Sequence, residues 1–216
     1  MYGFKYAFRV VAGWALILSV FSCSEKERSS KVTARPVGAE VPHRLRPLYP
    51  VPDFSFIDHR SNRVQLSDLK DRVWVANFIF TRCGSTCPMQ TAKLAGLQTS
   101  LQKKPWWKEV RFLSFTVDPE YDRPGVLAKY ALDHQATANW HFLTGKRSVI
   151  WDFSREGLKL PVDESGLDPK MPILHSSRTV LVDGRGQVRG YYDGLDDASL
   201  EKMKEDIETL LKEPLP

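Results

Sequence analysis

The feature that most constrains the fold is an apolar run that ends just before a pair of cysteines. Residues 73–80 read VWVANFIF, which is almost wholly apolar and rich in residues that favour strands. Such a run is typical of a strand buried on both faces of a sheet. Cys83 and Cys87 follow at once, and residues 88–103 have the composition of a helix. The sequence therefore predicts a buried strand that delivers two cysteines to the start of a helix.

Predicted strands and helices alternate along the rest of the chain. A hairpin is expected first, with strands at 54–57 and 64–66 around a turn at 59–63, followed by one helical turn at 67–70. Further strands are expected at 110–117, 140–143, 178–182 and 187–192, with a turn at 183–186, and further helices at 124–134, 147–157 and 197–211. This order implies a sheet with helices on both faces. We therefore expect an α/β, thioredoxin-like fold, with a central mixed sheet flanked by helices and an added N-terminal hairpin.

Length and charge limit the functions that the chain can have. Its 216 residues suit one domain with appendages, and 42% hydrophobic with 26% charged residues exclude a coiled coil, a collagen-like chain and a wholly disordered one. Lys and Arg number 31 against 26 Asp and Glu, a net charge of +5 that is spread along the chain. The sequence has no dense basic run with interleaved aromatic residues, so we expect no nucleic-acid partner.

The first residues have the three parts of an export signal. Lys5 and Arg9 supply positive charge, residues 10–21 form an uncharged and mostly apolar run, and Cys23 follows. The run VFSC that ends at Cys23 resembles the lipobox of bacterial lipoproteins, which implies a signal peptide over 1–22 and a lipid on Cys23. Plain secretion with an incidental Cys23, and an uncleaved membrane anchor, are the alternatives. Each of these exports the domain to an oxidising compartment.

A proline-rich tether is predicted between the signal and the folded domain. Residues 24–52 hold five prolines and few large apolar residues before Leu45, so we expect them to stay extended. The predicted organisation is a signal peptide at 1–22, a lipidated cysteine and tether at 23–52, and a thioredoxin-like domain at 53–216.

The two cysteines are placed for chemistry at a helix start. Positions four apart share one face of a helical turn, and the free N–H groups and dipole of a helix N-terminus favour the thiolate form of cysteine. Cys83 and Cys87 could therefore form a disulfide or bind a soft metal ion. An inert structural disulfide is the weaker alternative, because closing so small a loop contributes little stability.

Two thiolates alone give poor metal selectivity, so a third ligand is expected from elsewhere in the chain. The histidines, which are the usual third ligand, are His43, His59, His134, His141 and His175. The first four fall in the tether, in a turn or beside a loop, where surface positions are expected. His175 comes just before the strand predicted at 178–182, where a thioredoxin-like sheet would bring the chain past the cysteines.

The donor set predicted in this way favours copper over zinc. Two thiolates and one imidazole suit copper as Cu(I), with Cu(II) as the second state to consider. Structural zinc usually takes four protein ligands. Met89 and Met171 carry thioethers, but packing and loop-surface roles explain them better.

A second polar segment follows the strand predicted at 110–117. Residues 117–124 read VDPEYDRP. Because residues beyond the carboxyl ends of strands often line a site in α/β folds, Asp118 could approach the cysteines, orient His175 or meet a partner. The alternative, which physics alone favours, is that Asp118 and Asp122 only shape the turn and cap the following helix.

Taken together, these features resemble the Sco/SenC family of copper chaperones. The matching segments are the strand that runs into TRCGSTCP at 81–88, VDPEYDRP at 117–124, His175 before a strand–turn–strand that ends in YYDG at 191–194, and the terminal helix. The resemblance covers about residues 50–212 and is specific through the combination of the cysteine pair with the VDPxxDxP segment. One position departs from the family, which often has proline after the first cysteine, where this chain has the less constrained Gly84.

The resemblance implies a ligand set, a role and a location. Copper would be bound by Cys83, Cys87 and His175, with Asp118 near the site. The protein would deliver copper to, or reduce the cysteines of, the binuclear copper site of cytochrome c oxidase. Its implied partners are the copper-bearing subunit of that oxidase, other copper chaperones or thiol reductants, and a membrane reached through the lipid on Cys23. The implied location is the periplasmic side of a bacterial membrane.

Two other functions stay open at this point. A thiol–disulfide oxidoreductase, which would be an enzyme, would use Cys83 as the attacking thiolate and Cys87 as the resolving one, without a required metal or histidine. A lipid-anchored binding module with no transfer role is the third function.

Overall fold

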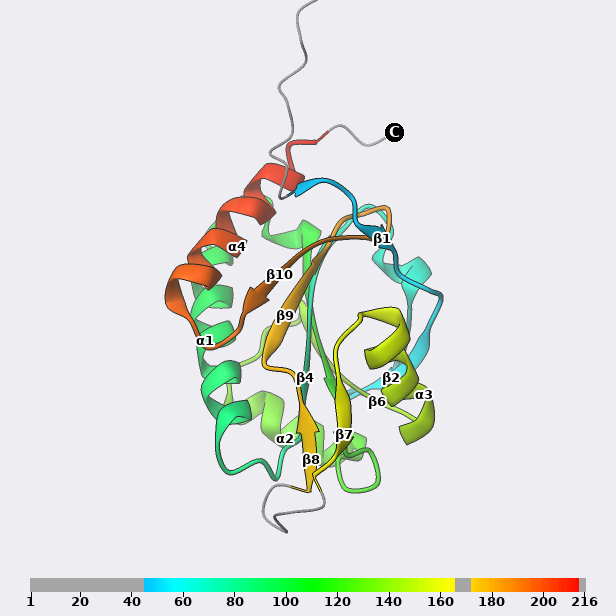
Figure 1. The fold of residues 1–216 in the computed structure, drawn as a ribbon. Helices are drawn as coiled ribbons and strands as arrows, with labels where there is room; N and C mark the ends of the chain where they lie inside the picture. The colour runs from blue at the N-terminus through cyan, green and yellow to red at the C-terminus, as the bar shows by residue number, and fades with distance from the viewer. Residues whose placement is uncertain (1–44, 166–171, 214–216) are drawn as a thin grey trace, which may run out of the picture. The chain divides into compact units, whose positions relative to one another are not determined.

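The computed structural model describes residues 45–165 and 172–213, and its strands form one large sheet and one small one (Figure 1). The strands are β1 (Tyr49–Pro50), β2 (Ser55–Asp58), β3 (Arg63–Gln65), β4 (Val73–Ile79), β5 (Val110–Thr116), β6 (Trp140–Thr144), β7 (Val162–Glu164), β8 (Ile173–His175), β9 (Arg178–Val182) and β10 (Gln187–Asp193). The helices are α1 (Thr86–Leu101), α2 (Pro124–Asp133), α3 (Arg147–Asp152) and α4 (Asp197–Leu210). Shorter turns are the 3₁₀ segments Leu66–Leu69 and Trp107–Glu109 and a π turn at Phe153–Gly157.

The large sheet is mixed, as the sequence predicts. Its eight strands have the order β1-β10-β9-β4-β5-β6-β2-β3. β5 pairs in parallel with β4 on one side and with β6 on the other, whereas β9 pairs with β4 in the antiparallel sense. The predicted N-terminal hairpin is confirmed as β2 and β3, and the predicted turn at 183–186 joins β9 to β10 with Gly186 at φ 72°, a conformation that favours glycine.

Helices pack on both sides of the large sheet. In Figure 1, α1 and α4 lie side by side on one side of the sheet and α3 lies on the other. All seven residues of β4 are buried, which explains why every one of them except Asn77 is apolar. The described residues contain no helix that combines the length and the apolar character needed to cross a membrane.

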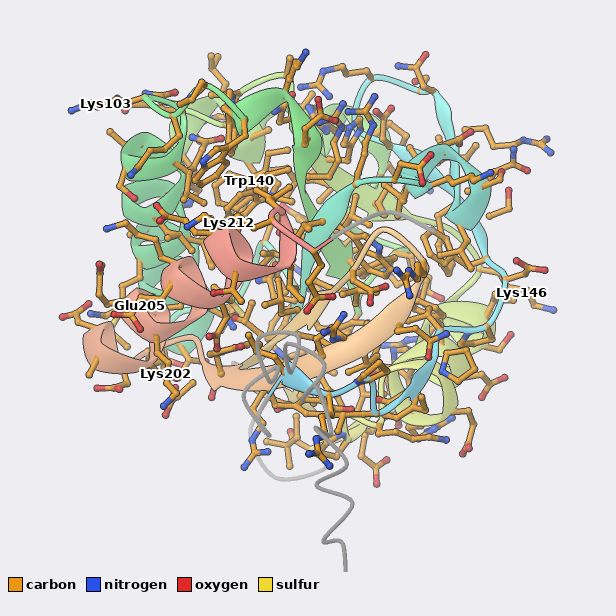
Figure 2. All side chains as sticks on the ribbon, turned by 90° about the horizontal axis from the view of Figure 1, so that it is seen from above. Lys103, Trp140, Lys146, Lys202, Glu205 and Lys212 are labelled. Atoms are coloured by element: carbon orange, nitrogen blue, oxygen red, sulfur yellow. The ribbon has the colours of Figure 1, made fainter. Side chains whose placement is uncertain are left out.

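Aromatic side chains dominate the core. The rings of Phe54, Phe115 and Phe153 pack with centroids 5.0 to 5.9 Å apart. Such ring pairs stabilise a core beyond the apolar area that they bury. Figure 2 shows Trp140 within the ribbon, whereas Lys103 and Lys146 lie at its outside.

The structure moves three boundaries of the sequence prediction. Helix α1 begins at Thr86, two residues before the predicted start, so Cys87 lies inside its first turn. The helix predicted at 147–157 is α3 followed by the π turn. The folded part also begins before residue 53, because β1 pairs with β10 and Val51 is buried. The end of the predicted tether is therefore packed, since its few apolar side chains find partners on the sheet. Residues 1–44, which include the predicted signal peptide, Cys23 and His43, lie outside the described residues, as does Met171.

Candidate metal centre

The two cysteines lie where β4 gives way to α1. After Ile79 the chain turns, and the N–H of Cys83 donates to the carbonyl of Phe80 at 3.1 Å. Cys83 stays in this turn, while Cys87 lies in the first turn of α1. Both side chains are buried, and neither is in a disulfide.

The fold brings His175 to Cys87. The Sγ atom of Cys87 and the Nε2 atom of His175 are 3.1 Å apart, although the residues are separated by 88 positions in the sequence. The other ring nitrogen, Nδ1, lies 3.1 Å from the carbonyl of Ser176, which can only accept a hydrogen bond. Nδ1 therefore carries the proton, and the lone pair of Nε2 faces the sulfur. The ring also packs edge-on against Phe80, with centroids 5.7 Å apart.

The two sulfurs differ in acidity. The pKa of Cys83 is lowered, because the thiol of Cys87 donates a hydrogen bond to it and the backbone N–H groups of Cys87 and Ser85 point at the same sulfur. The pKa of Cys87 is raised by that hydrogen bond and by burial. The Ser85 side chain makes no cap bond to α1, so the sulfur of Cys83 takes the place of a cap at this helix start. Cys83 is therefore the more acidic thiol of the pair.

Burial keeps the imidazole of His175 neutral. Its pKa is lowered, chiefly because the surrounding protein removes the water that would stabilise the charged ring. A neutral imidazole with a free Nε2 lone pair is the form that binds metals. The side chains in contact are thus a thiolate, a thiol and a neutral imidazole, which is a soft donor set.

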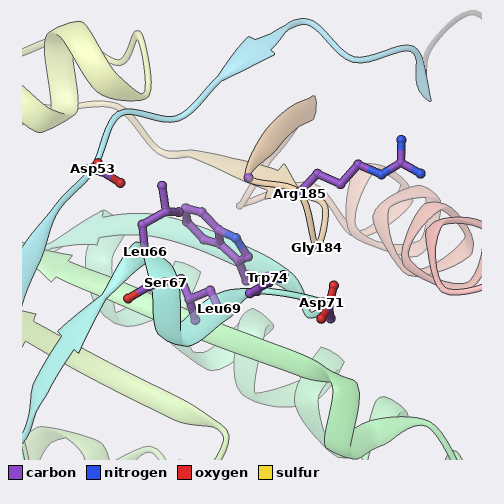
Figure 3. A pocket seen from close by; sticks show the side chains of 10 residues that line it. Asp53, Leu66, Ser67, Leu69, Asp71, Trp74, Gly184 and Arg185 are labelled. Atoms are coloured by element: carbon purple, nitrogen blue, oxygen red, sulfur yellow. The ribbon is translucent and has the colours of Figure 1, made fainter. Parts of the chain in front are cut away.

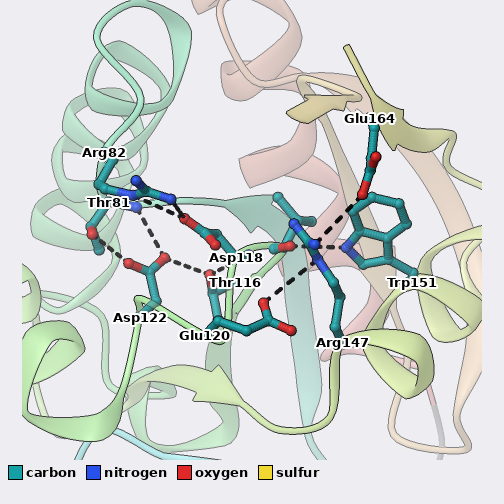
Figure 4. A network of polar contacts seen from close by, with 10 residues as sticks. Thr81, Arg82, Thr116, Asp118, Glu120, Asp122, Arg147, Trp151 and Glu164 are labelled. Carbon is teal, nitrogen blue, oxygen red and sulfur yellow. Dashed lines mark hydrogen bonds and ion pairs between the residues drawn. The ribbon is translucent and has the colours of Figure 1, made fainter. Parts of the chain in front are cut away.

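A buried carboxylate ties the cysteine turn to the neighbouring strand end (Figure 4). Asp122 accepts hydrogen bonds from the N–H of Thr81 at 3.0 Å, from the Thr81 hydroxyl and from the Thr116 hydroxyl at 2.5 Å. Burial raises the pKa of Asp122, and these hydrogen bonds oppose that shift. Asp122 does not cap α2, whose N-cap is Arg123. The expected capping role of Asp122 is therefore wrong, because its oxygens are already used to fix the turn before Cys83.

Asp118 contacts an arginine of the cysteine turn. Its Oδ2 lies 2.6 Å from a guanidinium nitrogen of Arg82. The same guanidinium lies over the ring of Tyr121, with its Cζ atom 4.6 Å from the ring centroid. No hydrogen bond or ion pair of Asp118 with Cys83, Cys87 or His175 occurs among the described residues. Asp118 therefore holds the rim of the turn, and Ser176 orients His175 in its place. Sequence reasoning missed Arg82, Thr81 and Thr116, although the first two lie within the matched segment.

A second polar contact in Figure 4 anchors α3 beside the same strand end. The indole N–H of Trp151 donates to the carbonyl of Val117 at 2.9 Å. Arg147 lies over the Trp151 ring at 4.9 Å and reaches Glu120 and Glu164, each at 3.6 Å.

The other described histidines are engaged elsewhere. His141 pairs with the buried Asp58 at 3.0 Å, and His59 accepts from the N–H of Phe142 at 3.1 Å. His134 packs on the ring of Tyr130, with centroids 4.4 Å apart. These contacts leave His175 as the described histidine that touches a cysteine.

An apolar cavity beside the start of β4 is separate from the cysteines (Figure 3). It has a volume of about 400 Å³ and is lined by Leu66, Leu69 and Trp74 together with the turn at Gly184. Trp74 is near the start of β4, whereas the cysteines follow its end. The cavity is therefore not part of the candidate metal centre.

Comparison with known proteins identifies the family of this chain. The model of the SCO1/SenC family matches residues 46–212. The SCO1 protein homolog of Bacillus subtilis is 34% identical over 163 residues, which are 74% of this chain and 82% of that protein. Among solved structures, a SCO1/SenC family lipoprotein from Bacillus anthracis matches with a TM-score of 0.71 at 31% identity, over 77% of this chain and 98% of that one.

A further structure adds a function stated for a relative. BsSco, described as a member of the Sco family of cytochrome c oxidase assembly proteins with a disulfide switch, matches with a TM-score of 0.69 at 34% identity, over 78% of this chain and 97% of that one. Sco proteins solved with copper bound, from Bradyrhizobium japonicum and yeast, share the fold at 18% and 23% identity. The matched segment contains the whole sheet and both cysteines, and the chain belongs to the SCO1/SenC family.

Proposed function

We propose that this protein binds one copper ion through Cys83, Cys87 and His175 and serves in the assembly of the binuclear copper site of cytochrome c oxidase. The observation that carries the proposal is the 3.1 Å contact between the Cys87 sulfur and the Nε2 atom of His175. It supports a site that combines the two cysteines of one turn with a histidine from a distant strand. Family membership supports the assembly role.

The donor chemistry fits Cu(I). Soft thiolates select Cu(I), and a neutral imidazole completes a three-ligand set. Within the described ranges, no three His, Cys, Asp or Glu side chains are gathered closely enough to hold a metal ion as they are arranged. Cys87 contacts both Cys83 and His175. We therefore expect side-chain rotation within this trio, and no change of fold, when copper is bound.

The protonation states of the two cysteines and His175 determine whether copper binding releases a proton. The lowered pKa values of Cys83 and His175 favour the thiolate and the neutral imidazole, and the raised pKa of Cys87 favours the thiol, so we expect the proton that leaves to come from Cys87. Copper uptake should therefore release a proton. Transfer to a partner would proceed by exchange of these ligands for the partner's cysteines, with the Cys87 proton restored as copper leaves.

Copper stoichiometry tests this proposal. A protein that lacks residues 1–40 would be reduced and loaded anaerobically with Cu(I). We expect one tightly held copper per chain in the unaltered protein. Loss of that copper in Cys83→Ser, Cys87→Ser and His175→Ala alike would establish the three ligands. Undiminished binding in any one of them would remove that residue from the site.

A thiol–disulfide oxidoreductase is the second candidate, and the difference in acidity between the two sulfurs favours it. The Cys83 thiolate would attack a partner disulfide and form a mixed disulfide, releasing one partner thiolate. Cys87 would then lose its proton, attack Cys83 and release the second partner thiolate, so that the partner gains two electrons and this chain becomes a disulfide. His175 takes no part in these steps. Full reductase turnover in His175→Ala together with absent copper binding in the unaltered protein would favour this function.

Anchoring at a membrane is part of the proposal. Residues 1–22 would be removed as a signal peptide, Cys23 would carry the lipid, and the following residues would tether the domain on the periplasmic side. The sequence run VFSC and the lipoprotein relative support this arrangement. Incorporation of labelled palmitate into the full chain, and its loss in Cys23→Ala, would test it. Equal labelling of both proteins would exclude Cys23 as the lipid site.

A further inference from the structure

A chain of buried hydrogen bonds crosses the core and ends beside the candidate metal centre. The indole N–H of Trp140 on β6 donates to the hydroxyl of Ser114 on β5 at 2.9 Å, and that hydroxyl donates to Oδ1 of Asn77 on β4 at 2.7 Å. The side-chain N–H of Asn77 donates to Oε1 of Gln90 on α1 at 3.4 Å. The side-chain N–H of Gln90 then donates to the carbonyl of Ser177 at 2.6 Å. The chain therefore links three strands and a helix to the segment that follows His175.

The direction of this chain of bonds is fixed from its first member. An indole N–H can only donate, so the Ser114 hydroxyl accepts a hydrogen bond from Trp140 and donates one to Oδ1 of Asn77. Asn77 then presents its N–H to Gln90, which leaves the N–H of Gln90 for the carbonyl of Ser177. Gln90 and Asn77 are almost completely buried, with 1% and 2% of their surface exposed. A buried amide with all its partners in place has one favourable orientation.

Two donors from separate elements hold the carbonyl of Ser177. One is the Gln90 side chain, and the other is the backbone N–H of Gly194, at 3.1 Å. A Cβ atom at position 194 would lie 2.7 Å from that carbonyl oxygen and would also collide with the Gln90 amide nitrogen. Glycine at 194 is therefore what allows the Gln90 amide to reach Ser177.

The hydrogen bond from the Gln90 side chain to the Ser177 carbonyl acts as a clamp between α1 and the segment after β8. This clamp fixes the positions of the candidate ligands relative to one another. Cys87 and Gln90 are three positions apart on α1, a spacing that places them on one side of the helix. Gln90 holds Ser177 through a hydrogen bond, and the carbonyl of the adjacent Ser176 accepts a hydrogen bond from Nδ1 of His175. One rigid helix thus carries a sulfur ligand and also holds the segment that orients the imidazole.

We infer that Gln90 is a positioning residue for His175, which sets the distance between the imidazole and Cys87 by clamping the carbonyl of Ser177 to α1. The inference rests on the proposed copper site for its functional meaning, but the clamp itself can be tested without metal. Removing an outer partner that orients a metal-binding histidine typically costs tenfold to a hundredfold in metal affinity.

The chain offers a matched control for this residue. Gln98 lies two turns along the same helix and is also buried, with 2% of its surface exposed. Its side chain donates to the carbonyl of Gln135 at 3.1 Å and accepts from the N–H of Thr137 at 2.8 Å. Gln90→Leu and Gln98→Leu therefore remove the same chemistry from the same helix, but only the first touches the segment beside His175.

The first measurement is backbone hydrogen exchange in the metal-free protein. We expect Gln90→Leu to speed exchange at residues 173–178 and at Gly194 by about tenfold or more, corresponding to the loss of about one hydrogen bond. Gln98→Leu should leave these amides unchanged. Gly194→Ala, which keeps Gln90 but displaces its amide, should reproduce the effect of Gln90→Leu.

The second measurement is the Cu(I) affinity of the same variants, by competition with a chromophoric Cu(I) chelator. Gln90→Leu should weaken binding by about tenfold or more, and it should cause no further loss when combined with His175→Ala, because its effect acts through that histidine. Unchanged exchange at 173–178 in Gln90→Leu, or equal losses in Gln90→Leu and Gln98→Leu, would overturn the inference. Altered exchange with no copper bound by the unaltered protein would refute the proposed function and leave the clamp supported.

Discussion

The sulfur of Cys87 lies 3.1 Å from the Nε2 atom of His175, and the opposite nitrogen of that ring is held by the carbonyl of Ser176. The pair joins the first turn of α1 to the end of β8. Because Nδ1 donates to that carbonyl, the lone pair of Nε2 is directed at the sulfur, and desolvation of the ring lowers the pKa of His175. This relationship makes His175 the residue whose loss should most clearly separate copper binding from thiol chemistry.

Replacing His175 by alanine should weaken Cu(I) binding by at least about tenfold while leaving the cysteines able to form and exchange a disulfide. Chelator competition and a thiol–disulfide exchange assay would measure the two properties. His134→Ala is the matched control, since His134 packs on Tyr130 and should retain full copper affinity. Equal affinity in His175→Ala and the unaltered protein would contradict the ligand assignment.

The acidity of Cys83 predicts an unusual pH profile for alkylation. Its pKa lies below the ordinary value of 9.0 because Cys87 donates a hydrogen bond to its sulfur. The thiolate, which is the reactive form, should therefore persist as the pH falls below 9, and the iodoacetamide rate should drop only near the lowered pKa. Cys87→Ala removes the donor and should move the profile of Cys83 to higher pH. An unchanged profile in that variant would show that Cys87 does not stabilise the thiolate.

The hydrogen bonds of Asp122 predict a stability cost when they are removed. Asp122→Ala leaves the N–H and hydroxyl of Thr81 and the hydroxyl of Thr116 without their acceptor. We expect the free energy of unfolding in urea to fall by about 1–3 kcal/mol. Asp133→Ala, which removes an exposed helix ion pair with Lys129, should change it by less than about 1 kcal/mol. Similar small losses in both variants would show that Asp122 does not fix the turn.

A buried arginine should matter more for folding than the surface charges do. Arg189 is 3% exposed and pairs with Asp183 at 2.6 Å and Glu213 at 2.7 Å, and it also donates to the carbonyl of Leu45. Arg189→Met would leave the buried carboxylate of Asp183 unpaired, so we expect a loss of about 3 kcal/mol or more in unfolding free energy. Lys129→Met, at an exposed pair, should cost less than about 1 kcal/mol. A loss of similar size at both positions would argue against this buried network.

Local sequence patterns predicted most of the fold, because the apolar and polar pattern of each strand follows from its burial in the sheet. Most of the run at 73–80 became β4, because its side chains are buried and an almost wholly apolar strand is stable only inside a sheet that is covered on both faces. The start of α1 was predicted two residues late, because Ser85 makes no side-chain cap bond that the sequence could signal. β7 and β8 were not predicted, since three residues each are too few for a visible alternation.

The spacing of residues along the sequence predicted less of the candidate metal centre than of the fold. His175 was a candidate from its place before β9, but only the folded chain shows its ring nitrogen at the Cys87 sulfur. The role of Asp122 was misjudged because an aspartate before a predicted helix ordinarily suggests a cap. Gln90 was invisible for a different reason, since a glutamine within a helix gives no sign of being buried or of reaching a distant carbonyl.

The copper ligands can be counted most directly by X-ray absorption at the copper edge of the Cu(I)-loaded protein, with and without His175→Ala. The account predicts two sulfur ligands and one nitrogen ligand from imidazole in the unaltered protein, and loss of the imidazole signal in His175→Ala. A site with sulfur ligands alone, or an imidazole signal that persists in His175→Ala, would contradict the proposal that Cys83, Cys87 and His175 together hold the metal.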